Sequence, residues 1–323
     1  MIVTLTPNPS LDRTIELPGA LVRGEVQRAV TAHQEPGGKG VNICRALEAS
    51  GVKSLAILPG DAADPVLLAL CAQHIPHLGL PIGVTLRSNV AITEPDGTTT
   101  KVNEPGPALT GAQQADLIDL VLRQAEGASW LVLAGSLPPG VPAPFYADLT
   151  RSLRARFGAA APKVAIDSSG EPLSAAVAAG PDLLKPNADE LAELTGISDP
   201  GSLEADPHLA ARAAQTLITA GVGAVLATLG SKGALLVTAA GYWLAQSPPI
   251  VAVSTVGAGD SALAGYLLCA DTGAGPAECL RQAAAHGAAA ASLPGSTVPA
   301  LEQTNPSVVT VTAFPTHPKE DDQ

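Results

Sequence analysis

The residues best suited to chemistry lie in a short glycine-rich stretch near the C-terminal end of the chain. Asp260 follows Gly257, Ala258 and Gly259 and begins an Ala- and Leu-rich helical pattern. Small residues allow a sharp turn and a close approach of the backbone to a ligand, and the first amides of a helix have no partner within it. The stretch therefore predicts an anion site, with Asp260 placed to accept a proton from a hydroxyl that attacks a bound phosphoryl group. A structural turn in which Asp260 caps the helix is the alternative.

Two further expectations concern this stretch. The β-branched run 250–256 predicts a strand that leads into the glycine turn. The positive end of a helix dipole favours an ionised carboxylate, so we predict a low pKa and weak basicity for Asp260.

A second glycine-rich turn supplies a cation. Residues 36–42 read Pro-Gly-Gly-Lys-Gly-Val-Asn and lead into an amphipathic helical pattern over 41–50. The glycines around Lys39 again allow the backbone to approach a ligand, and Lys39 brings positive charge to an acidic chain. Glycine rather than Ser or Thr follows Lys39, so the turn is not a Walker A loop.

A third cluster joins a strand end to a helix start. A strand pattern over 182–185 brings Lys185 and Asn187 to the start of a helical pattern that contains Glu190. An amide and a carboxylate three residues apart can hold a hydrated Mg²⁺ ion from one face of a helix. A structural N-cap at Asn187 fits the same spacing equally well, so both interpretations stay open.

Most of the chain alternates between strand and helix patterns, among them strands predicted over 130–134, 163–167 and 224–228 and a helix predicted over 188–195. This order is typical of a doubly wound, mostly parallel α/β sheet, which gathers the carboxyl ends of its strands along one rim. Segments 12–34 and 85–105 contain β-prone runs without a helical period, and we predict that they form a small β-sheet lid. The edges and one uncovered face of the lid favour pairing with a second copy, as a homodimer. We expect one domain over 1–311 and a polar C-terminal tail over 312–323.

Composition narrows the range of partners. The 323 residues carry a formal net charge of −12, which argues against nucleic acid or an anionic membrane as a partner. Hydrophobic residues make up 46% of the chain, so a large core is available, but no apolar run has the length of a membrane span. The 4 cysteines lack paired spacing, and a strand pattern rather than a leader begins the chain, so we expect a cytoplasmic protein.

Four motifs occur in the order found in a known family. The stretches 37–42 and 256–260 resemble the two signatures of the PfkB carbohydrate kinases, which have the ribokinase-like fold. Lys185, Asn187 and Glu190 resemble the magnesium-associated motif of that family, and residues 228–233 resemble its ATP-phosphate loop. The resemblance covers roughly residues 1–310.

Further stretches resemble the phosphosugar branch of this family. Residues 6–12 and 135–140 are similar to the branch that contains the 1-phosphofructokinases and the tagatose-6-phosphate kinases. The stretches most similar to 1-phosphofructokinases are 23–26, 38–40 and 101–106. One position departs from their pattern, because Ala91 stands where many bacterial members carry a lysine that is thought to help hold the substrate phosphate.

The resemblance implies ATP-dependent phosphorylation of a ketohexose phosphate. The expected reaction converts fructose 1-phosphate to fructose 1,6-bisphosphate, and tagatose 6-phosphate and fructose 6-phosphate are alternative acceptors within the family. A non-catalytic sugar-phosphate sensor is the rival from another class. ATP and Mg²⁺ are the expected cofactors, and dependence on a monovalent cation stays open.

The resemblance also assigns roles to individual residues. Asp260 is the expected catalytic base and follows Gly257, Ala258 and Gly259, in a turn where the amides of Ala258, Gly259 and Asp260 hold charge on the transferred group. The residues expected to bind the sugar phosphate are Asp12, Gly38, Lys39, Asn42, Arg87 and Ser136. Those expected to bind ATP are Lys185, Asn187, Thr228, Gly230 and Gly233, with Asn187 and Glu190 holding Mg²⁺ through water. For Asp12, Arg87 and Lys101, each taken singly, a solvated surface role is the alternative.

Overall fold

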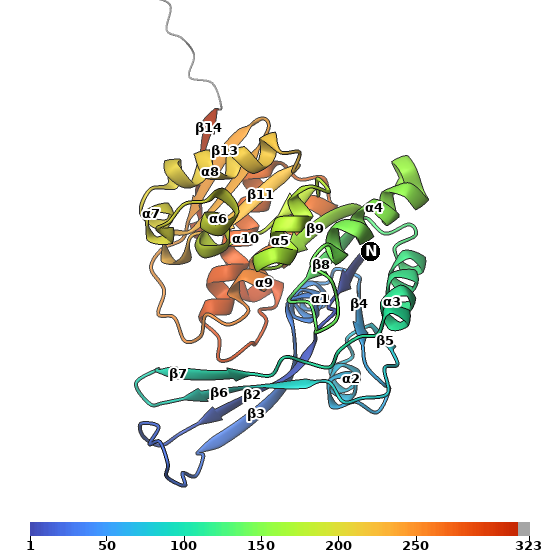
Figure 1. Cartoon of the computed structure of the whole chain (residues 1–323). Coiled ribbons are helices and arrows are strands. Elements are labelled where there is room, and N and C mark those ends of the chain that lie inside the picture. The colour runs from blue at the N-terminus through green and yellow to red at the C-terminus, as the bar shows by residue number, and fades with distance from the viewer. Residues whose placement is uncertain (316–323) are drawn as a thin grey trace, which may run out of the picture.

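The larger part of the fold is built on a ten-stranded sheet, seen here in a computed structural model that describes residues 1–315 (Figure 1). Its strands are β1 Ile2–Leu5, β4 Ser54–Pro59, β5 His77–Leu80, β8 Trp130–Ala134, β9 Lys163–Asp167, β10 Leu183–Leu184, β11 Ala224–Thr228, β12 Ala234–Thr238, β13 Gly241–Gln246 and β14 Thr310–Pro315. They follow the order β14-β13-β12-β11-β10-β9-β8-β1-β4-β5. The pairs from β5 to β11 are parallel, and those from β11 to β14 are antiparallel. This topology confirms the predicted doubly wound, mostly parallel α/β fold.

Helices cover both faces of this sheet. They are α1 Lys39–Ala49, α2 Pro65–Ala72, α3 Gly111–Gln124, α4 Phe145–Phe157, α5 Gly170–Val177, α6 Ala188–Thr195, α7 Pro200–Ala205, α8 Pro207–Thr219, α9 Ala258–Asp271 and α10 Pro276–Ala291. Side chains of β8 alternate between two cores: Leu131 points toward the helices α2 to α8, and Val132 points toward α1, α9 and α10. Within residues 1–315, no helix has the length and apolar character needed to cross a bilayer.

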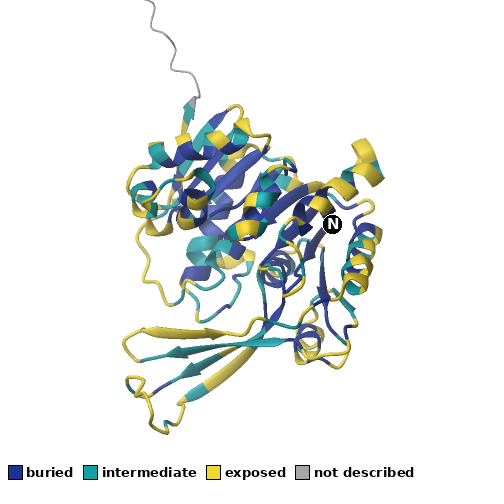
Figure 2. Cartoon of the chain, in the orientation of Figure 1, coloured by how far each residue is buried: buried dark blue, intermediate teal, exposed yellow. Residues whose placement is uncertain are grey.

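A second sheet of four strands forms the predicted lid and projects from the rim of the large sheet (Figure 1). Its strands are β2 Ser10–Glu16, β3 Thr31–Gly37, β6 Arg87–Thr93 and β7 Thr99–Asn103, in the order β3-β2-β6-β7. The strand β7 is exposed along its whole length and β6 is half-buried, so the lid contrasts with the buried large sheet (Figure 2).

The order of the large sheet reverses between β1 and β8, and a crevice at such a reversal is where open α/β sheets bind ligands. The chain leaves β1 through Asn8 and leaves β8 through Ser136. The Asn8 Nδ2 atom donates to Ser136 Oγ at 3.3 Å, which joins the two loops. The lid strand β2 follows β1 almost directly, so the lid is attached at this crevice.

The predicted strand over 250–256 is wrong. These residues form an extended loop between β13 and α9. Val251 is 88% exposed, and the N–H groups of Val253 and Ser254 donate only to the Ala291 carbonyl at the end of α10. A β-branched run becomes a strand only where another strand pairs with it, and among residues 1–315 no strand pairs with this segment.

The predicted start of the polar tail is also wrong. Residues 312–315 belong to β14, which pairs with β13 along its length. The rings of Tyr242 and Phe314 stack across this pair with their centroids 4.9 Å apart. The remainder of the predicted tail, 316–323, lies outside the described residues.

Candidate active site

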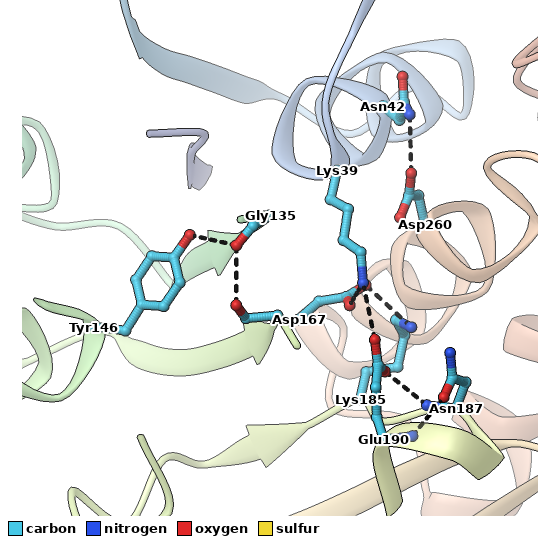
Figure 3. A network of polar contacts seen from close by, with 10 residues as sticks. Lys39, Asn42, Gly135, Tyr146, Asp167, Lys185, Asn187, Glu190 and Asp260 are labelled. Atoms are coloured by element: carbon cyan, nitrogen blue, oxygen red, sulfur yellow. Dashed lines mark hydrogen bonds and ion pairs between the residues drawn. The ribbon is translucent and has the colours of Figure 1, made fainter. Parts of the chain in front are cut away.

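Charged side chains from separate segments meet at the rim of the large sheet (Figure 3). Lys39 from the start of α1 places its Nζ atom 2.6 Å from Asp167 Oδ1, at the end of β9. The same Nζ atom lies 3.6 Å from Glu190 Oε1 in α6, and Lys185 Nζ lies 3.1 Å from Asp167 Oδ2. We call Lys39, Asp167, Lys185 and Glu190 the ion cluster. It concentrates two lysines of an acidic chain at one place.

The predicted anion site forms the first turn of α9. Gly257 is the N-cap with φ 75°, a left-handed conformation that glycine adopts without strain. Within residues 1–315, the N–H groups of Gly259 and Asp260 have no acceptor, whereas Ala258 N–H donates to the Thr255 carbonyl at 3.3 Å. A Cβ atom added to Gly259 would lie 3.2 Å from the ammonium nitrogen of Lys185, so the turn offers free amides with a cation beside them.

Asp260 is buried, with 7% of the residue exposed, and its Oδ2 atom accepts from Asn42 Nδ2 at 2.9 Å. Burial raises the pKa of Asp260 to about 6, and the nearby negative charge of Asp167 adds to the rise. Lys39, Asn42 and Lys185 act against the rise but do not cancel it. This direction is opposite to the low pKa predicted from the helix dipole, and its main cause is the removal of water from the carboxylate.

The ion cluster holds Lys39 away from the lid. Burial acts to lower the pKa of Lys39, but Asp167 and Glu190 outweigh this effect and raise it. Burial acts to raise the pKa of Asp167, but Lys185 and Lys39 hold it below its usual value. The ion pairs thus favour the charged forms of both Lys39 and Asp167. Lys39, which we expected to contact the phosphate of the sugar, points toward Asp167 and Glu190 (Figure 3).

Sequence reasoning missed Asp167, although it predicted the bounds of β9 correctly. The signal was a single acid at the carboxyl end of an apolar strand, which by itself resembles a solvated turn residue. Its partners come from α1 and from the residue after β10, so only the assembled sheet shows that Asp167 is completely buried between two lysines.

Asn187 and Glu190 form a capping box at the start of α6. Glu190 N–H donates to Asn187 Oδ1 at 2.7 Å, and Asn187 N–H donates to Glu190 Oε2 at 2.9 Å. The structural cap that the sequence left open is thus present. The second carboxylate oxygen of Glu190 remains directed at the ion cluster.

The predicted ATP-phosphate loop lies beside this helix start. Thr228 N–H donates to the Pro186 carbonyl at 3.0 Å, so the loop begins next to Lys185. Gly230 and Gly233 have φ of 55° and 108°, and a Cβ atom on Gly233 would collide with the carbonyl of β13 that faces it. The loop therefore needs both glycines to stay against the sheet edge.

On the lid side, Asp12 is the centre of a polar group. Its Oδ1 atom accepts from Ser10 Oγ at 2.7 Å and from Asn89 Nδ2 at 3.1 Å. Burial raises the pKa of Asp12, and these hydrogen bonds act against the rise. A Cβ atom on Gly37 would collide with the Asp12 carboxylate, so this glycine lets the turn before α1 approach the lid. Sequence reasoning identified Asp12 but missed Asn89, which lies opposite it on β6.

The other residues predicted to hold the sugar phosphate lie near this group. Arg87 donates to the carbonyls of Asn8 at 2.9 Å and Glu104 at 3.1 Å, and burial lowers its pKa. Asn8 also contacts Ser136, so it connects two predicted residues that the sequence could not place together. Gly38, with φ 110°, is the N-cap of α1 and precedes Lys39.

A cleft of about 550 Å³ separates the lid from the segment 252–256 and the loop after α10. Asp12 and Asn89 are among the residues that line it. Ala91 and Lys101 also line it and face one another across β6 and β7. The cleft can therefore hold a polar molecule between the lid and the segment that leads into α9.

The chain is similar to known carbohydrate kinases over most of its length. The profile of the pfkB family carbohydrate kinases matches residues 6–303. A 1-phosphofructokinase of Rhodobacter capsulatus is 37% identical over 296 residues, which cover 88% of this chain and 88% of that protein. An ATP-dependent 6-phosphofructokinase isozyme 2 of Mycobacterium tuberculosis is 33% identical and covers 91% of this chain and 85% of its own. Phosphofructokinase-2 of Escherichia coli with fructose-6-phosphate superposes with a TM-score of 0.80 and 31% identity, over 90% of this chain and 93% of that chain.

The matched residues contain every motif that forms the rim, from the turn before α1 to the turn before α9. A ribokinase of Thermotoga maritima shares the fold, with a TM-score of 0.70 at 21% identity. This chain belongs to the pfkB family of carbohydrate kinases and has its ribokinase-like fold.

Proposed function

We propose that this protein transfers the terminal phosphoryl group of ATP to the free primary hydroxyl of fructose 1-phosphate, which yields fructose 1,6-bisphosphate. The observation that carries the proposal is the buried Asp260 carboxylate beside the free amides of Gly259 and Asp260. Phosphoryl transfer to an alcohol needs a proton acceptor next to an anion site. The 1-phosphofructokinases that resemble this chain over most of its length support fructose 1-phosphate as the acceptor.

In this reaction the acceptor hydroxyl lies between Asp260 and the terminal phosphate of ATP. Asn42 engages the Oδ2 atom of Asp260, so Oδ1 is available for the hydroxyl proton. As the new oxygen–phosphorus bond forms and the bond to the leaving ADP oxygen breaks, this proton passes to Asp260. The amides of Gly259 and Asp260 stabilise the charge on the transferred group. A pKa of about 6 leaves Asp260 ionised at neutral pH and makes it a stronger base than an ordinary aspartate.

The ion cluster is assigned to the phosphates of ATP and not to the phosphate of the sugar. Lys39 and Lys185 share Asp167, and Lys185 lies beside the anion turn. Cations in this place can neutralise the oxygens around the reacting phosphorus. The loop from Thr228 to Gly233 starts at the same edge, which supports the assignment of ATP to this part of the rim.

The residues of this edge fit a hydrated Mg²⁺ ion held in the outer sphere. Asn187 Oδ1 and Glu190 Oε2 each accept one hydrogen bond in the capping box and keep a lone pair, and Glu190 Oε1 faces the ion cluster. Mg²⁺ usually keeps several waters and binds through phosphate oxygens. Within residues 1–315, no three His, Cys, Asp or Glu side chains form a metal-ligand group, so direct ligation by the protein is not assigned. When bound with ATP, Mg²⁺ supplies further neutralisation of the phosphates.

The phosphate already on the sugar is assigned to the lid. Lys101 lies directly opposite Ala91 and lines the same cleft as Asp12. The small Ala91 side chain leaves space for the Lys101 ammonium near the position where many 1-phosphofructokinases carry a lysine. Arg87 is the second cation on this side, although both of its Nη atoms already donate to backbone carbonyls.

A substrate panel tests the proposal. ADP release is followed with ATP, Mg²⁺ and, in parallel, fructose 1-phosphate, fructose 6-phosphate and tagatose 6-phosphate, and we expect the highest kcat/KM with fructose 1-phosphate. A higher value with fructose 6-phosphate would favour the activity named for the M. tuberculosis relative. Sugar-phosphate binding without ADP release would identify a sensor. Repeating the assay with potassium replaced by a large organic cation tests monovalent-cation dependence, since E. coli phosphofructokinase-2 has been solved in complex with potassium.

A homodimer through the lid and a cytoplasmic location complete the proposal. Val26 is 97% exposed and Val30 68% exposed near the lid strands, and a second copy would cover such apolar surface. ATP and phosphosugars occur inside the cell, which supports the cytoplasm. Light scattering is expected to give the mass of a dimer, and a monomer of 32.3 kDa would contradict this part of the proposal.

A further inference from the structure

Arg45 lies in the second turn of α1 and is buried, with 5% of the residue exposed. Its guanidinium contacts acceptors from several segments. The Nε atom donates to Gln73 Oε1 at 3.1 Å, and Nη2 lies 3.4 Å from Glu35 Oε1. The acceptors of Nη1 are the Pro36 carbonyl at 3.4 Å, the Ser296 carbonyl at 3.4 Å and Asn42 Oδ1 at 3.5 Å.

These contacts join the base of the lid to the back of the anion site. Glu35 lies near the end of the lid strand β3, which leads through Gly38 into α1. Ser296 lies in the loop after α10, and its Oγ atom donates to Glu35 Oε2 at 2.8 Å. A Cβ atom on Gly257 would lie 4.0 Å from the Cα atom of Ser296, so this loop is adjacent to the anion turn. One buried cation therefore connects three parts that surround the reacting groups.

The contact with Asn42, at 3.5 Å the longest that Arg45 makes, favours one direction of a side-chain amide. An asparagine amide can exchange its oxygen and nitrogen by a half turn, because the two ends have nearly the same shape. A guanidinium can only donate, so Arg45 draws the Oδ1 atom of Asn42 toward itself and leaves Nδ2 facing Asp260 at 2.9 Å. Once Asp260 has taken up a proton, it could donate to a reversed amide. Arg45 disfavours that reversed state.

We propose that Arg45 is a positioning residue for phosphoryl transfer, which holds the Asn42 amide as a donor to Asp260 and ties it to the base of the lid. This inference rests on the proposed role of Asp260 as the proton acceptor. It distinguishes Arg45 from a residue that only stabilises the fold, since loss of Arg45 must change the ionisation of Asp260.

The test measures the ionisation of Asp260 directly by NMR, without substrates and without an activity assay. The ¹³C signal of the Asp260 carboxyl, assigned with Asp260→Asn, is followed against pH in the full-length protein. Arg45→Met removes the donor that orients Asn42, and we expect the Asp260 midpoint to rise by about one pH unit, the value of one hydrogen bond. The other groups that face Asp260 are Lys39 on α1, Asp167 on β9 and Lys185 after β10, and these stay in place.

Arg154→Met is the matched control. Arg154 donates to the carbonyls of Ala179 and Gly180 at 2.6 and 2.7 Å, on the opposite side of the sheet from α1. It therefore loses arginine–carbonyl contacts without touching Asn42. We expect this variant to be less stable than the wild type and to keep the Asp260 midpoint.

A double-mutant cycle tests whether Arg45 shifts the Asp260 midpoint through the Asn42 amide. In an Asn42→Leu background, Arg45→Met should add no further shift if Arg45 acts through the amide. If Arg45→Met does not fold, Arg45→Lys decides in its place, because lysine keeps the cation but lacks the second nitrogen, and a smaller rise is expected. An unchanged midpoint in a folded Arg45 variant overturns the proposal. A wild-type kcat in Asp260→Asn would instead refute Asp260 as the base, so the two failures are distinguishable.

Discussion

The charged side chains of the rim are buried and paired, whereas Arg13 and Lys101 on the lid are exposed and unpaired within the described residues. At the rim, Asp167 is completely buried and paired with two lysines, and Asp260 is nearly buried beside them. On the lid, Arg13 and Lys101 are exposed, and the described residues offer them no ion pair. Charges interact strongly where water is excluded, whereas exposed charges are screened and add little individually. Under the proposed function, the groups for phosphoryl transfer are preorganised at the rim, while the contacts proposed for the acceptor phosphate lie on a solvated sheet.

The largest effect is expected at the centre of the rim. Asp260→Asn removes the proton acceptor but keeps the shape of the side chain and an oxygen for Asn42. We expect kcat to fall at least ~10²-fold with little change in the KM for ATP. Steady-state rates with both substrates varied measure this. A kcat near that of the wild type would show that Asp260 is not the proton acceptor. The buried charges of the rim would then differ from those of the lid in stability alone and not in catalysis.

The same substitution should make the protein more stable at neutral pH. A folded-state pKa of about 6, above the ordinary value of 3.8, means that folding disfavours the ionised carboxylate. The penalty grows as the pH rises from the unfolded pKa to about 6 and is complete above it. Thermal melts should therefore show a higher Tm for Asp260→Asn at neutral pH, and the gain should disappear below about pH 4.

Asp167→Asn tests whether the buried charges of the rim depend on one another. The change leaves Lys39 and Lys185 without the carboxylate between them, and breaking a buried pair typically costs about 3–5 kcal/mol. The Lys39 side chain is 33% exposed and keeps Glu190 as a neighbour, so we expect a loss of about 3 kcal/mol in the free energy of unfolding. Urea denaturation measures it.

The matched control for this prediction is Asp182→Asn. Asp182 forms an ion pair with Arg154 at 3.5 Å, and its side chain is 38% exposed. Because exposed pairs contribute little, we expect a loss of less than about 1 kcal/mol. Equal losses in the two variants would mean that burial does not distinguish the rim from the surface.

The sequence predicted best the features that depend on local pattern. The bounds of β8, β9, β11 and α6 are as predicted, because apolar runs and turn residues limit each element. The run 250–256 has the composition of a strand but joins neither sheet of the described residues, and pairing is a property of the whole sheet.

In the candidate site, too, features set by local sequence were predicted and features set by contacts between distant segments were not. The spacing of its motifs predicted the anion turn and the glycine loops, since backbone geometry follows from residue type. Four features were missed: the role of Asp167, the ion pairs of Lys39, the raised pKa of Asp260 and the place of Asn89 opposite Asp12. Each depends on how much water distant segments exclude and on which partner they bring, and neither is visible in a single stretch of residues.

A moderate effect is expected from pH. Because Asp260 must be ionised to accept a proton and its pKa is about 6, kcat should fall on the acid side, about tenfold for each pH unit below that value. The kcat at saturating substrate is measured, since the phosphate of the substrate also titrates near 6 in solution. The Asp12 carboxyl, whose pKa burial also raises, is the control: Asp12→Asn should raise the KM for the sugar but keep this acid limb.

The smallest effect is expected on the lid. Lys101→Met removes one exposed cation, worth about 1 kcal/mol, so the KM for fructose 1-phosphate should rise about fivefold with kcat unchanged. The double variant Ala91→Lys with Lys101→Met should restore the KM, because the two positions face one another in the cleft. Lys53→Met, at an exposed lysine beside β4, is the control and should leave KM unchanged. A wild-type KM in Lys101→Met would assign the acceptor phosphate to the half-buried Arg87. Binding of the sugar phosphate would then depend on a partly buried charge, as phosphoryl transfer at the rim does.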